Sequence, residues 1–413
     1  MKKIFAVLAI LLVANVASAQ AGYMLEGVVV FSRHNIRAPL SGKNSAFAKI
    51  TPHDWFKWTS PAGELSMRGG ELETIMGQYF RKWLANENLI TENYQPAAGE
   101  VRFYANSMQR TIATAKIFSS AMFPVADVPV EHKFAVGESD PVFNPQLTFD
   151  NYSYRAQVNE HMRAAFAAKT PTDSYRLLER VLDFKDSAFA KEAGLTHFRD
   201  DELETTFDID KGLDADTTLR LAAQAADALT LQYYETDNPV KAAFGQKISF
   251  SDWQKISAVK DFFGEVFYSA PNIAVNTARP LLQVINDELS LNRKFTFLCG
   301  HDSNLVSIFV ALDVEDYSLP QTIETKTPVG GKFILEKLRG TDGSIYVAAK
   351  LIYQSAEQLR NKTTLTLDNP PMIVPIYFKG LARNADGLYR LEDLQERFRQ
   401  VIDAYKLPTD KAA

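Results

Sequence analysis

A continuous run of β-branched and aromatic residues at positions 28–31 is followed at once by charged side chains. Because these apolar residues do not alternate with polar ones, the segment 26–32 is predicted to be a strand buried on both faces, as in a parallel sheet covered by helices. Such a sheet needs strands and helices to alternate along the chain. The patterns that follow predict a helix at 66–88, a strand at 101–105, a helix up to residue 123 and a short strand at 128–132.

The middle of the chain interrupts this alternation. From residue 137 to residue 292 the apolar residues recur mostly at helical spacing, and a strand pattern returns at 294–299. The simplest architecture is an α/β domain made of two separated segments, 20–136 and 293–413, with a mostly helical cap domain, 137–292, inserted between them. The sequence therefore predicts an α/β fold with a mostly parallel sheet flanked by helices.

The N-terminus has the pattern of a targeting segment. Lys2 and Lys3 precede an apolar stretch at 4–16 that is too short to span a bilayer, and small residues at 17–19 form a cleavage signal. Residues 1–19 are therefore predicted to be a signal peptide, which would place the mature protein in the periplasm or outside the cell. The rest of the sequence has no apolar run of about 18 residues, so no membrane contact is expected after cleavage.

Composition and charge narrow the range of partners. The chain has 413 residues, 46% of them hydrophobic, and its net charge is -5, so it lacks the basic excess that nucleic-acid binding requires. A single cysteine, Cys299, excludes disulfides within the chain and thiolate zinc sites, and the six histidines lack the spacing of a metal motif. A small-molecule partner is expected, without metal or cofactor, and the oligomeric state stays open.

Charged side chains follow three of the predicted strands. The carboxyl ends of parallel strands meet at one edge of a sheet, where open α/β proteins bind their ligands. The side chains are Arg33, His34 and Arg37 after the first strand, Arg110 after the second, and His301 and Asp302 after the strand at 294–299. Taken alone, Arg110 would be a surface arginine and Asp302 a helix cap. Taken together, the six residues predict one site.

These residue types suit phosphate chemistry. Arginine presents planar N–H forks that match phosphate oxygens, and each charged hydrogen bond contributes about 1.5–3 kcal/mol. A neutral imidazole can attack phosphorus, and a neighbouring carboxylic acid can protonate the departing alkoxide. The set therefore predicts hydrolysis of phosphomonoesters without a metal. A protein that only binds phosphate esters would need neither His34 nor Asp302.

Two motifs resemble those of the histidine acid phosphatases. The segment Arg33-His34-Asn35-Ile36-Arg37-Ala38-Pro39 resembles their signature R-H-G-x-R-x-P, and His301-Asp302 resembles their distal H-D motif. Most members have glycine where this chain has Asn35. That asparagine, together with the segments 231–235, 327–332 and 353–361, is most similar to the bacterial glucose-1-phosphatase branch. The resemblance implies an α/β domain like that of phosphoglycerate mutase, with an α-helical cap.

The resemblance also implies a role for each residue. His34 is expected to be the nucleophile and Asp302 the proton donor. The residues expected to hold the phosphoryl group are Arg33, Arg37, Arg110 and His301. Glu235 matches a substrate-contacting position, where a carboxylate would suit sugar hydroxyls and repel a highly phosphorylated inositol.

The sequence therefore predicts an exported acid phosphatase that hydrolyses sugar phosphomonoesters, glucose 1-phosphate foremost, through a covalent phosphohistidine. Two alternatives share this chemistry: a phytase, which acts on inositol hexakisphosphate, and an acid phosphatase of broad specificity. A third alternative is not an enzyme but a protein that binds phosphate esters without turning them over.

Overall fold

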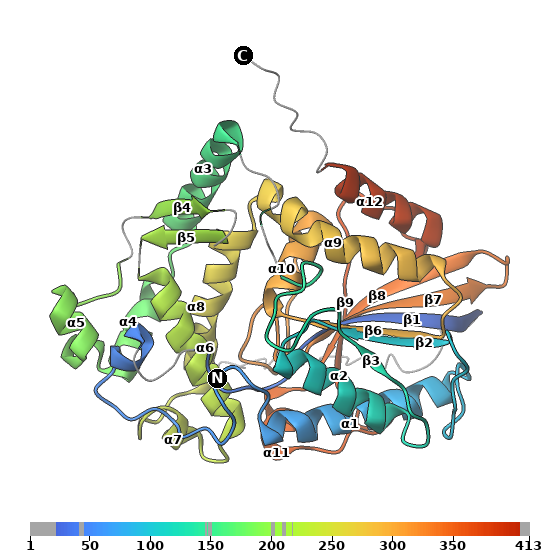
Figure 1. The fold of residues 1–413 in the computed structure, drawn as a ribbon, viewed down its shortest axis with the longest axis horizontal. Coiled ribbons are helices and arrows are strands. Elements are labelled where there is room, and N and C mark those ends of the chain that lie inside the picture. The colour runs from blue at the N-terminus through green and yellow to red at the C-terminus, as the bar shows by residue number, and fades with distance from the viewer. Residues whose placement is uncertain are drawn as a thin grey trace, which may run out of the picture.

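The structure is a computed structural model that describes residues 22–40, 45–144, 147, 151–199, 203–208, 212–216 and 218–404. The predicted signal peptide, residues 1–19, lies outside the described residues. A sheet with helices on both faces forms one part of the molecule, and a largely helical part stands beside it (Figure 1).

The central sheet has eight strands in the order β10-β8-β7-β1-β6-β2-β3, with β9 paired to β8. Their bounds are β1 (Tyr23–Arg33), β2 (Val101–Ala105), β3 (Val130–Glu131), β6 (Phe295–Gly300), β7 (Lys332–Gly340), β8 (Ile345–Tyr353), β9 (Met372–Pro375) and β10 (Tyr389–Arg390). β1 lies between β7 and β6 and is buried from residue 27 to residue 33, as its continuous apolar sequence predicts.

The sheet is mixed rather than mostly parallel. β1, β6, β2 and β3 run parallel to one another, whereas β7, β8, β9 and β10 pair antiparallel. The prediction of a parallel sheet thus holds for one half of it. The other half is antiparallel because the short turn at 341–344 joins β7 directly to β8, and a turn of that length cannot make the crossover that parallel strands need.

Helices cover both faces of this sheet (Figure 1). On one face lie α1 (Met67–Asn86) and α2 (Gln109–Met122), and on the other lie α9 (Pro271–Ser290), α10 (Asp302–Ala311) and α12 (Leu391–Ala404). The first layer packs through aromatic side chains such as Phe80, Phe118 and Phe297, and the second through aliphatic ones such as Leu281 and Leu298. The predicted α/β architecture with flanking helices is confirmed.

The second part of the molecule, called the cap below, contains the elements between β3 and α9. These are α3 (Tyr152–Lys169), α4 (Thr172–Leu182), α5 (Ala188–Ala193), α6 (Leu219–Glu235), α7 (Pro239–Ala242), α8 (Phe250–Tyr268) and a hairpin of β4 (Glu204–Asp208) and β5 (Gly212–Asp216). Its core is continuous with Ile36 from the loop after β1 and with Leu72 from α1. The cap is therefore packed against the elements that carry the predicted site.

The domain division 20–136 and 293–413 against 137–292 stays a prediction, and α9 bears on it. Leu281, Ile285 and Leu289 of this helix belong to the same core cluster as β-strand residues of the central sheet. The C-terminal part of the segment 137–292 therefore contributes to the helical layer on the sheet as well as to the connection from the cap.

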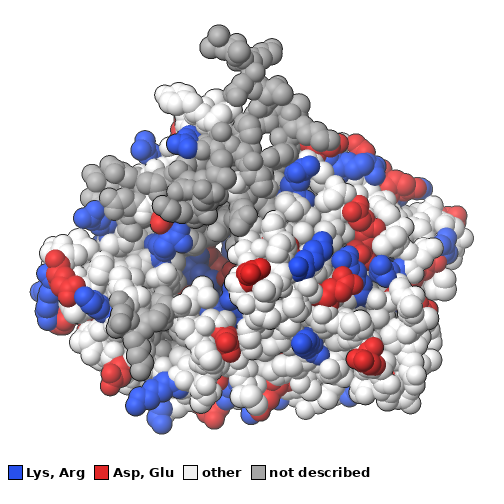
Figure 2. Space-filling view, viewed as in Figure 1, with Lys and Arg blue, Asp and Glu red and all other residues white. Residues whose placement is uncertain are grey.

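The described residues include no helix long and apolar enough to cross a membrane. Figure 2 shows that basic and acidic side chains are interspersed over the face of the α/β part in this view, so neither sign of charge dominates that face.

Candidate active site

The loops that follow β1, β2 and β6 come together at one edge of the sheet. The backbone N–H of His34 donates to Gly300 O at 3.1 Å, and the N–H of Asn106 donates to Cys299 O at 2.9 Å. Since β6 pairs with both β1 and β2, these bonds tie the first residues of all three loops to one another. The strand order therefore brings the predicted residues of the three loops side by side.

The loop after β1 is held close to the start of α1. The N–H of Ser66, the N-cap of α1, donates to Ile36 O at 2.9 Å. A Cβ atom at Gly69 would lie 2.4 Å from the same carbonyl oxygen, so only glycine allows the helix to approach this closely. The loop after β1 is thus packed between the sheet edge and the first turn of α1.

His34 is buried, and its ring orientation is set by the backbone. Its Nδ1 lies 2.8 Å from Asn35 O, and because a carbonyl oxygen can only accept, Nδ1 carries the proton. The lone pair is therefore on Nε2. Burial lowers the pKa of His34 well below its ordinary value, and the nearby Arg110 and Arg37 lower it further. These effects favour the neutral imidazole, which is the form that can act as a nucleophile.

Three arginines lie around His34 with part of their hydrogen-bonding capacity unused. Arg33 Nη1 donates to Thr327 O at 2.6 Å, Arg37 Nη2 donates to a carboxylate of the cap at 2.8 Å, and Arg110 Nη1 donates to Gly63 O at 3.4 Å. Within the part of the chain that the structure describes, the Nε atoms of all three are buried without a hydrogen-bond partner. Unpaired buried donors are costly, so the cluster is a site that an anion with several oxygens would complete.

His301 stands across from His34 at the N-terminus of α10. The two ring centroids are 5.5 Å apart and the rings are nearly perpendicular. Asn106 Nδ2 donates to His301 Nε2 at 2.6 Å, which leaves the ring proton on Nδ1, 3.4 Å from Arg110 Nη2. Burial and the nearby Arg110 lower the pKa of His301 to about 3. Two N–H groups that face each other without a shared acceptor again fit a phosphoryl oxygen.

Asp302, the first residue of α10, is paired with two cations. Its Oδ2 lies 2.6 Å from Lys260 Nζ and 3.4 Å from Arg33 Nη2. Burial raises the pKa of Asp302, but Lys260 and Arg33 outweigh this effect and hold the pKa well below its ordinary value. The ionised form of the carboxyl group is therefore favoured.

Two charged residues of the site, Asp227 of α6 and Lys260 of α8, were not predicted from the sequence. Asp227 Oδ2 accepts from Arg37 Nη2 at 2.8 Å, and its Oδ1 is 3.8 Å from Arg33 Nη2. A signal was present, because Asp227 is an acidic residue in the middle of an alanine-rich helix that is otherwise mostly buried. Both residues reach the loops of the sheet only through the packing of the cap.

Glu235, which the resemblance placed at a substrate-contacting position, has Ser66 as its hydrogen-bond partner. It is at the C-terminal end of α6, two turns beyond Asp227, where it accepts a hydrogen bond from Ser66 Oγ at 2.7 Å. Burial raises the pKa of Glu235, while Ser66 and Arg68 oppose the rise. The other six predicted residues come together. The hydrogen bond of Glu235 to Ser66 joins the end of α6 to the start of α1.

A cavity of about 230 Å³ adjoins the cluster on the cap side. Its polar lining includes Arg37, Asp227, Lys260, Asp261 and Asp302, and its apolar lining includes Leu40, Phe263, Tyr268 and Val306. A phosphate held by the arginines would have its ester group in this space. Mixed polar and apolar walls of this kind suit a small organic ligand.

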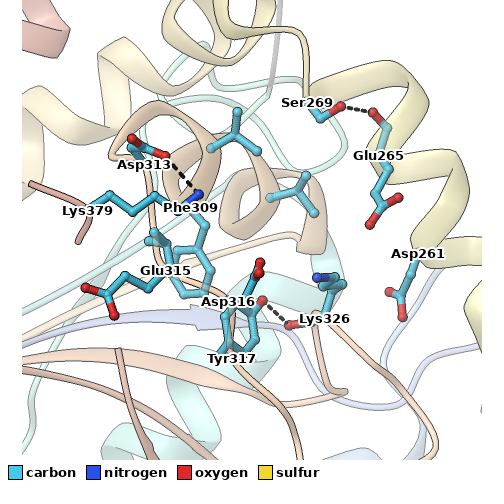
Figure 3. Close-up of a pocket in the computed structure, with 13 residues that line it drawn as sticks. Asp261, Glu265, Ser269, Phe309, Asp313, Glu315, Asp316, Tyr317, Lys326 and Lys379 are labelled. Carbon is cyan, nitrogen blue, oxygen red and sulfur yellow. Dashed lines mark hydrogen bonds and ion pairs between the residues drawn. The ribbon is translucent and has the colours of Figure 1, made fainter. Parts of the chain in front are cut away.

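Figure 3 shows a neighbouring cavity, of about 280 Å³, which shares Asp261 and Val306 with the first. Five carboxylates line it, namely Asp261, Glu265, Asp313, Glu315 and Asp316, against two lysines, Lys326 and Lys379. Lys379 lies 3.4 Å from Asp313, so one of the two cations is already paired. The excess of negative charge makes this cavity unsuited to phosphate, and none of the seven predicted site residues lines it.

No group of three His, Cys, Asp or Glu side chains that could hold a metal ion occurs among the described residues. Positive charge at the cluster is supplied by arginine and lysine side chains instead.

Comparisons with known proteins agree with this geometry. The family model of the histidine phosphatase superfamily, branch 2, matches residues 24–353. The chain is similar to a glucose-1-phosphatase of Salmonella typhimurium, with 36% identity over 94% of this chain and 95% of the relative, and to one of Providencia rettgeri, with 33% identity over 93% of each. Among solved structures it is similar to a Hafnia alvei phytase, with a TM-score of 0.84, 25% identity, and coverage of 94% of this chain and 99% of the other.

Proposed function

This chain belongs to branch 2 of the histidine phosphatase superfamily and is a phosphomonoester hydrolase, and from this premise we propose that it hydrolyses sugar phosphates, glucose 1-phosphate foremost, through a phosphohistidine on His34. One observation carries the proposal. The bond from His34 Nδ1 to Asn35 O directs the lone pair to Nε2, in a ring that three arginines with unpaired Nε atoms surround.

The proposed reaction has two steps. His34 Nε2 attacks phosphorus, the bond from phosphorus to the ester oxygen breaks, and the leaving alkoxide takes a proton from Asp302. Water then attacks the phosphohistidine and gives a proton to the Asp302 carboxylate, the bond from phosphorus to Nε2 breaks, and inorganic phosphate leaves. Arg33, Arg37, Arg110 and the Nδ1–H of His301 hold the phosphoryl oxygens in both steps. Hydrogen-bond donors fixed in advance are effective because they need no rearrangement as charge develops.

Asp302 must gain a proton before it can donate one, although Lys260 and Arg33 favour its ionised form. A bound phosphate supplies the reason for the change. Its negative charge lies beside the carboxylate and competes for the same two cations, and both effects raise the pKa of Asp302. We therefore propose that substrate and proton bind together, which gives an acidic pH optimum.

The charges around the cavity support a substrate with one phosphate group. Lys260 is paired with Asp302, Arg37 is paired with Asp227, and Asp261 adds a further carboxylate. A sugar ring could bond to such carboxylates through its hydroxyl groups. An inositol that carries further phosphates would place negative charge against Asp227 and Asp261, which is unfavourable at short range.

The cellular location is also part of the proposal. Lys2 and Lys3, the apolar stretch at 4–16 and the small residues at 17–19 support export and cleavage, so we place the mature enzyme in the periplasm. Cell fractionation together with N-terminal sequencing of the mature protein tests this. Recovery of the uncleaved chain in the cytoplasm would contradict it.

The nucleophile and the metal-free chemistry are tested together. The wild type is assayed with p-nitrophenyl phosphate in excess EDTA, and labelled substrate is trapped by quenching in alkaline denaturant, in which phosphohistidine survives. Label is expected on His34, and the variant His34→Ala should fold but neither turn over nor trap label. Label on a serine or aspartate, or activity that requires an added divalent cation, would refute the mechanism. Binding of phosphate without turnover would favour the binding-protein alternative.

Substrate preference needs a separate panel. We expect kcat/KM to be highest for glucose 1-phosphate when it is compared with glucose 6-phosphate and inositol hexakisphosphate. A higher value for inositol hexakisphosphate would identify the chain as a phytase, and equal values for all three would identify an enzyme of broad specificity.

A further inference from the structure

A buried ion pair lies behind the loop that carries His34, and none of the chemistry above uses it. Glu73 of α1 and Lys332, the first residue of β7, have side chains with 0% exposure. Lys332 Nζ is 3.1 Å from both carboxylate oxygens of Glu73, and it also donates to Ser32 Oγ at 3.2 Å and to Gly330 O at 3.0 Å. The pair therefore joins α1 and β7 to Ser32, which lies in β1 two residues before His34.

Stability alone does not account for such a pair. Removing two charges from water costs several kcal/mol for each ion, and apolar residues of similar size are often as stable or more stable in the same place. Besides these polar partners, Lys332 has aromatic neighbours, since the rings of Phe118 and Phe297 lie 5.4 and 5.7 Å from its Nζ. A role in fixing the geometry of neighbouring groups would explain the pair better than a role in holding the sheet together.

Asn35 connects the pair to the nucleophile. Its Nδ2 donates to Glu73 Oε1 at 2.7 Å, and its Oδ1 accepts from the N–H of Ile36 at 2.8 Å. The carbonyl oxygen of the same residue accepts from His34 Nδ1. The position of the Glu73 carboxylate thus sets the position of Asn35, and the position of Asn35 sets the tautomer and orientation of the catalytic ring.

The opposite side of Asn35 is closed by Gly330. This glycine has a φ of +66°, and a Cβ atom there would lie 2.6 Å from Asn35 Nδ2. Its N–H donates to His34 O at 3.3 Å. Asn35 is therefore held between Glu73 and the backbone at residue 330, with no room to take another position.

We propose that the buried pair Glu73–Lys332 is a positioning device for the nucleophile, which acts through Asn35 to hold His34 Nε2 in line with phosphorus. The inference rests on the proposed function, because it assigns these residues to the same reaction. It concerns positioning rather than binding, because the guanidinium of Arg33 donates to Thr327 O and that of Arg37 donates to Asp227, and not to Glu73.

Two double variants separate the link to Asn35 from the ion pair itself. E73L/K332M removes both charges and the acceptor for Asn35 Nδ2, whereas E73Q/K332M removes the charges and keeps an amide oxygen that can accept the same bond. We expect E73L/K332M to lose about 10–100-fold in kcat, as displacements of about 1 Å of a reacting group can cost, with KM and inhibition by inorganic phosphate unchanged. E73Q/K332M should recover most of this loss.

A second ion pair in the same sheet provides the matched control. Glu336 of β7 and Lys350 of β8 are 2.8 Å apart, and Glu336 is buried, but neither contacts the nucleophile loop. E336L/K350M should keep the wild-type kcat whatever its stability. Asn35→Ala leaves Glu73 and Lys332 paired and should reproduce the loss in kcat, which covers the case in which E73L/K332M does not fold.

The outcomes can be told apart from a failure of the proposed function. If the wild type hydrolyses phosphomonoesters and folded E73L/K332M or Asn35→Ala does so at the wild-type kcat, the positioning role is wrong. An equal loss in E73Q/K332M would also overturn it. A readout without turnover is the ¹⁵N signal of His34, which should report a single Nδ1–H tautomer in the wild type and a mixture in E73L/K332M. An inactive wild type would refute the proposed function, while this signal would still decide the inference.

Discussion

The proposed role of Asp302, donation of a proton to a poor leaving group, gives a prediction that separates two roles. The alkoxide of a sugar is a strong base and needs that proton in the transition state, whereas p-nitrophenolate leaves without help. Asp302→Asn should therefore lower kcat for glucose 1-phosphate by about 10²–10⁴-fold and lower kcat for p-nitrophenyl phosphate much less. Equal losses with both substrates, in a folded variant, would mean that Asp302 only positions the site.

In the proposed mechanism Lys260 sets the pH range in which Asp302 carries that proton. The ammonium group at 2.6 Å favours the ionised carboxylate, so its removal raises the pKa of Asp302. A general acid is active only while protonated, and activity is lost as pH rises through its pKa. In Lys260→Met the alkaline limb of the kcat profile should therefore move to higher pH, by about one unit or more, as expected for a charge at this distance.

The control for Lys260 comes from the same helix. Lys255 lies five residues earlier in α8, is exposed, and pairs with Asp252 rather than with a residue of the site. Lys255→Met should leave the pH profile unchanged. A profile for Lys260→Met that coincides with the wild-type profile, or that moves to lower pH, would show that another group limits the alkaline limb.

Helix α6 carries two carboxylates, and the structure gives them different partners. Asp227 faces Arg33 and Arg37, whereas Glu235, two turns later, bonds to Ser66. Asp227→Asn should raise the relative kcat/KM for inositol hexakisphosphate over glucose 1-phosphate, because it removes a negative charge from the cavity wall. Charge repulsion at the edge of a wet cavity is about 1–4 kcal/mol, so a change of about 10-fold or more is expected.

Glu235→Gln is the matched control, since it removes a charge from the same helix outside the cavity. Steady-state kinetics with both substrates should show no change in their ratio. If Glu235→Gln changed the ratio and Asp227→Asn did not, the position implied by the sequence resemblance would be the correct one.

The elements show which parts of this site can be predicted from sequence. The buried run of β1 and the charged residues after it could be predicted, because a parallel strand and its C-terminal loop are local features. The sequence marks Asp227 only as an acidic residue in an alanine-rich helix. That Asp227 and Lys260 belong to the site could not be predicted, since their side chains reach the loops only when α6 and α8 pack over the sheet. The hairpin of β4 and β5 was also missed: its sequence is acidic and lacks an apolar pattern.

In the whole molecule the site is assembled from two parts that lie far apart in the sequence. The α/β part supplies His34, the arginines and His301, while the cap supplies Asp227 and Lys260 (Figure 1). The two parts share one apolar core, which includes Ile36 of the loop after β1 and Leu72 of α1. A change in how the cap packs therefore alters the charge around Asp302 before it alters the position of His34, which is anchored to the sheet and α1.

This assembly also makes the stability of the protein depend on pH. His34 and His301 are buried in their neutral forms, with pKa values below the ordinary 6.5 and, for His301, about 3. As the pH falls below about 6.5, the unfolded chain takes up protons at both histidines and the folded chain does not. The free energy of unfolding therefore decreases as the pH decreases. Each histidine contributes up to about 1.4 kcal/mol per pH unit over this range.

His301→Gln removes one of the two groups and gives the last prediction. For both proteins the free energy of unfolding is plotted against pH between about 6.5 and about 4. The slope for the variant should be smaller than the slope for the wild type by up to about 1.4 kcal/mol per pH unit, whatever the stability of the variant near neutral pH. Denaturant unfolding at several pH values measures the slope. His132 is exposed, so His132→Gln should keep the wild-type slope. An unchanged slope in His301→Gln would mean that His301 is protonated in the folded protein, and a cationic His301 could not accept the hydrogen bond that Asn106 donates to its Nε2.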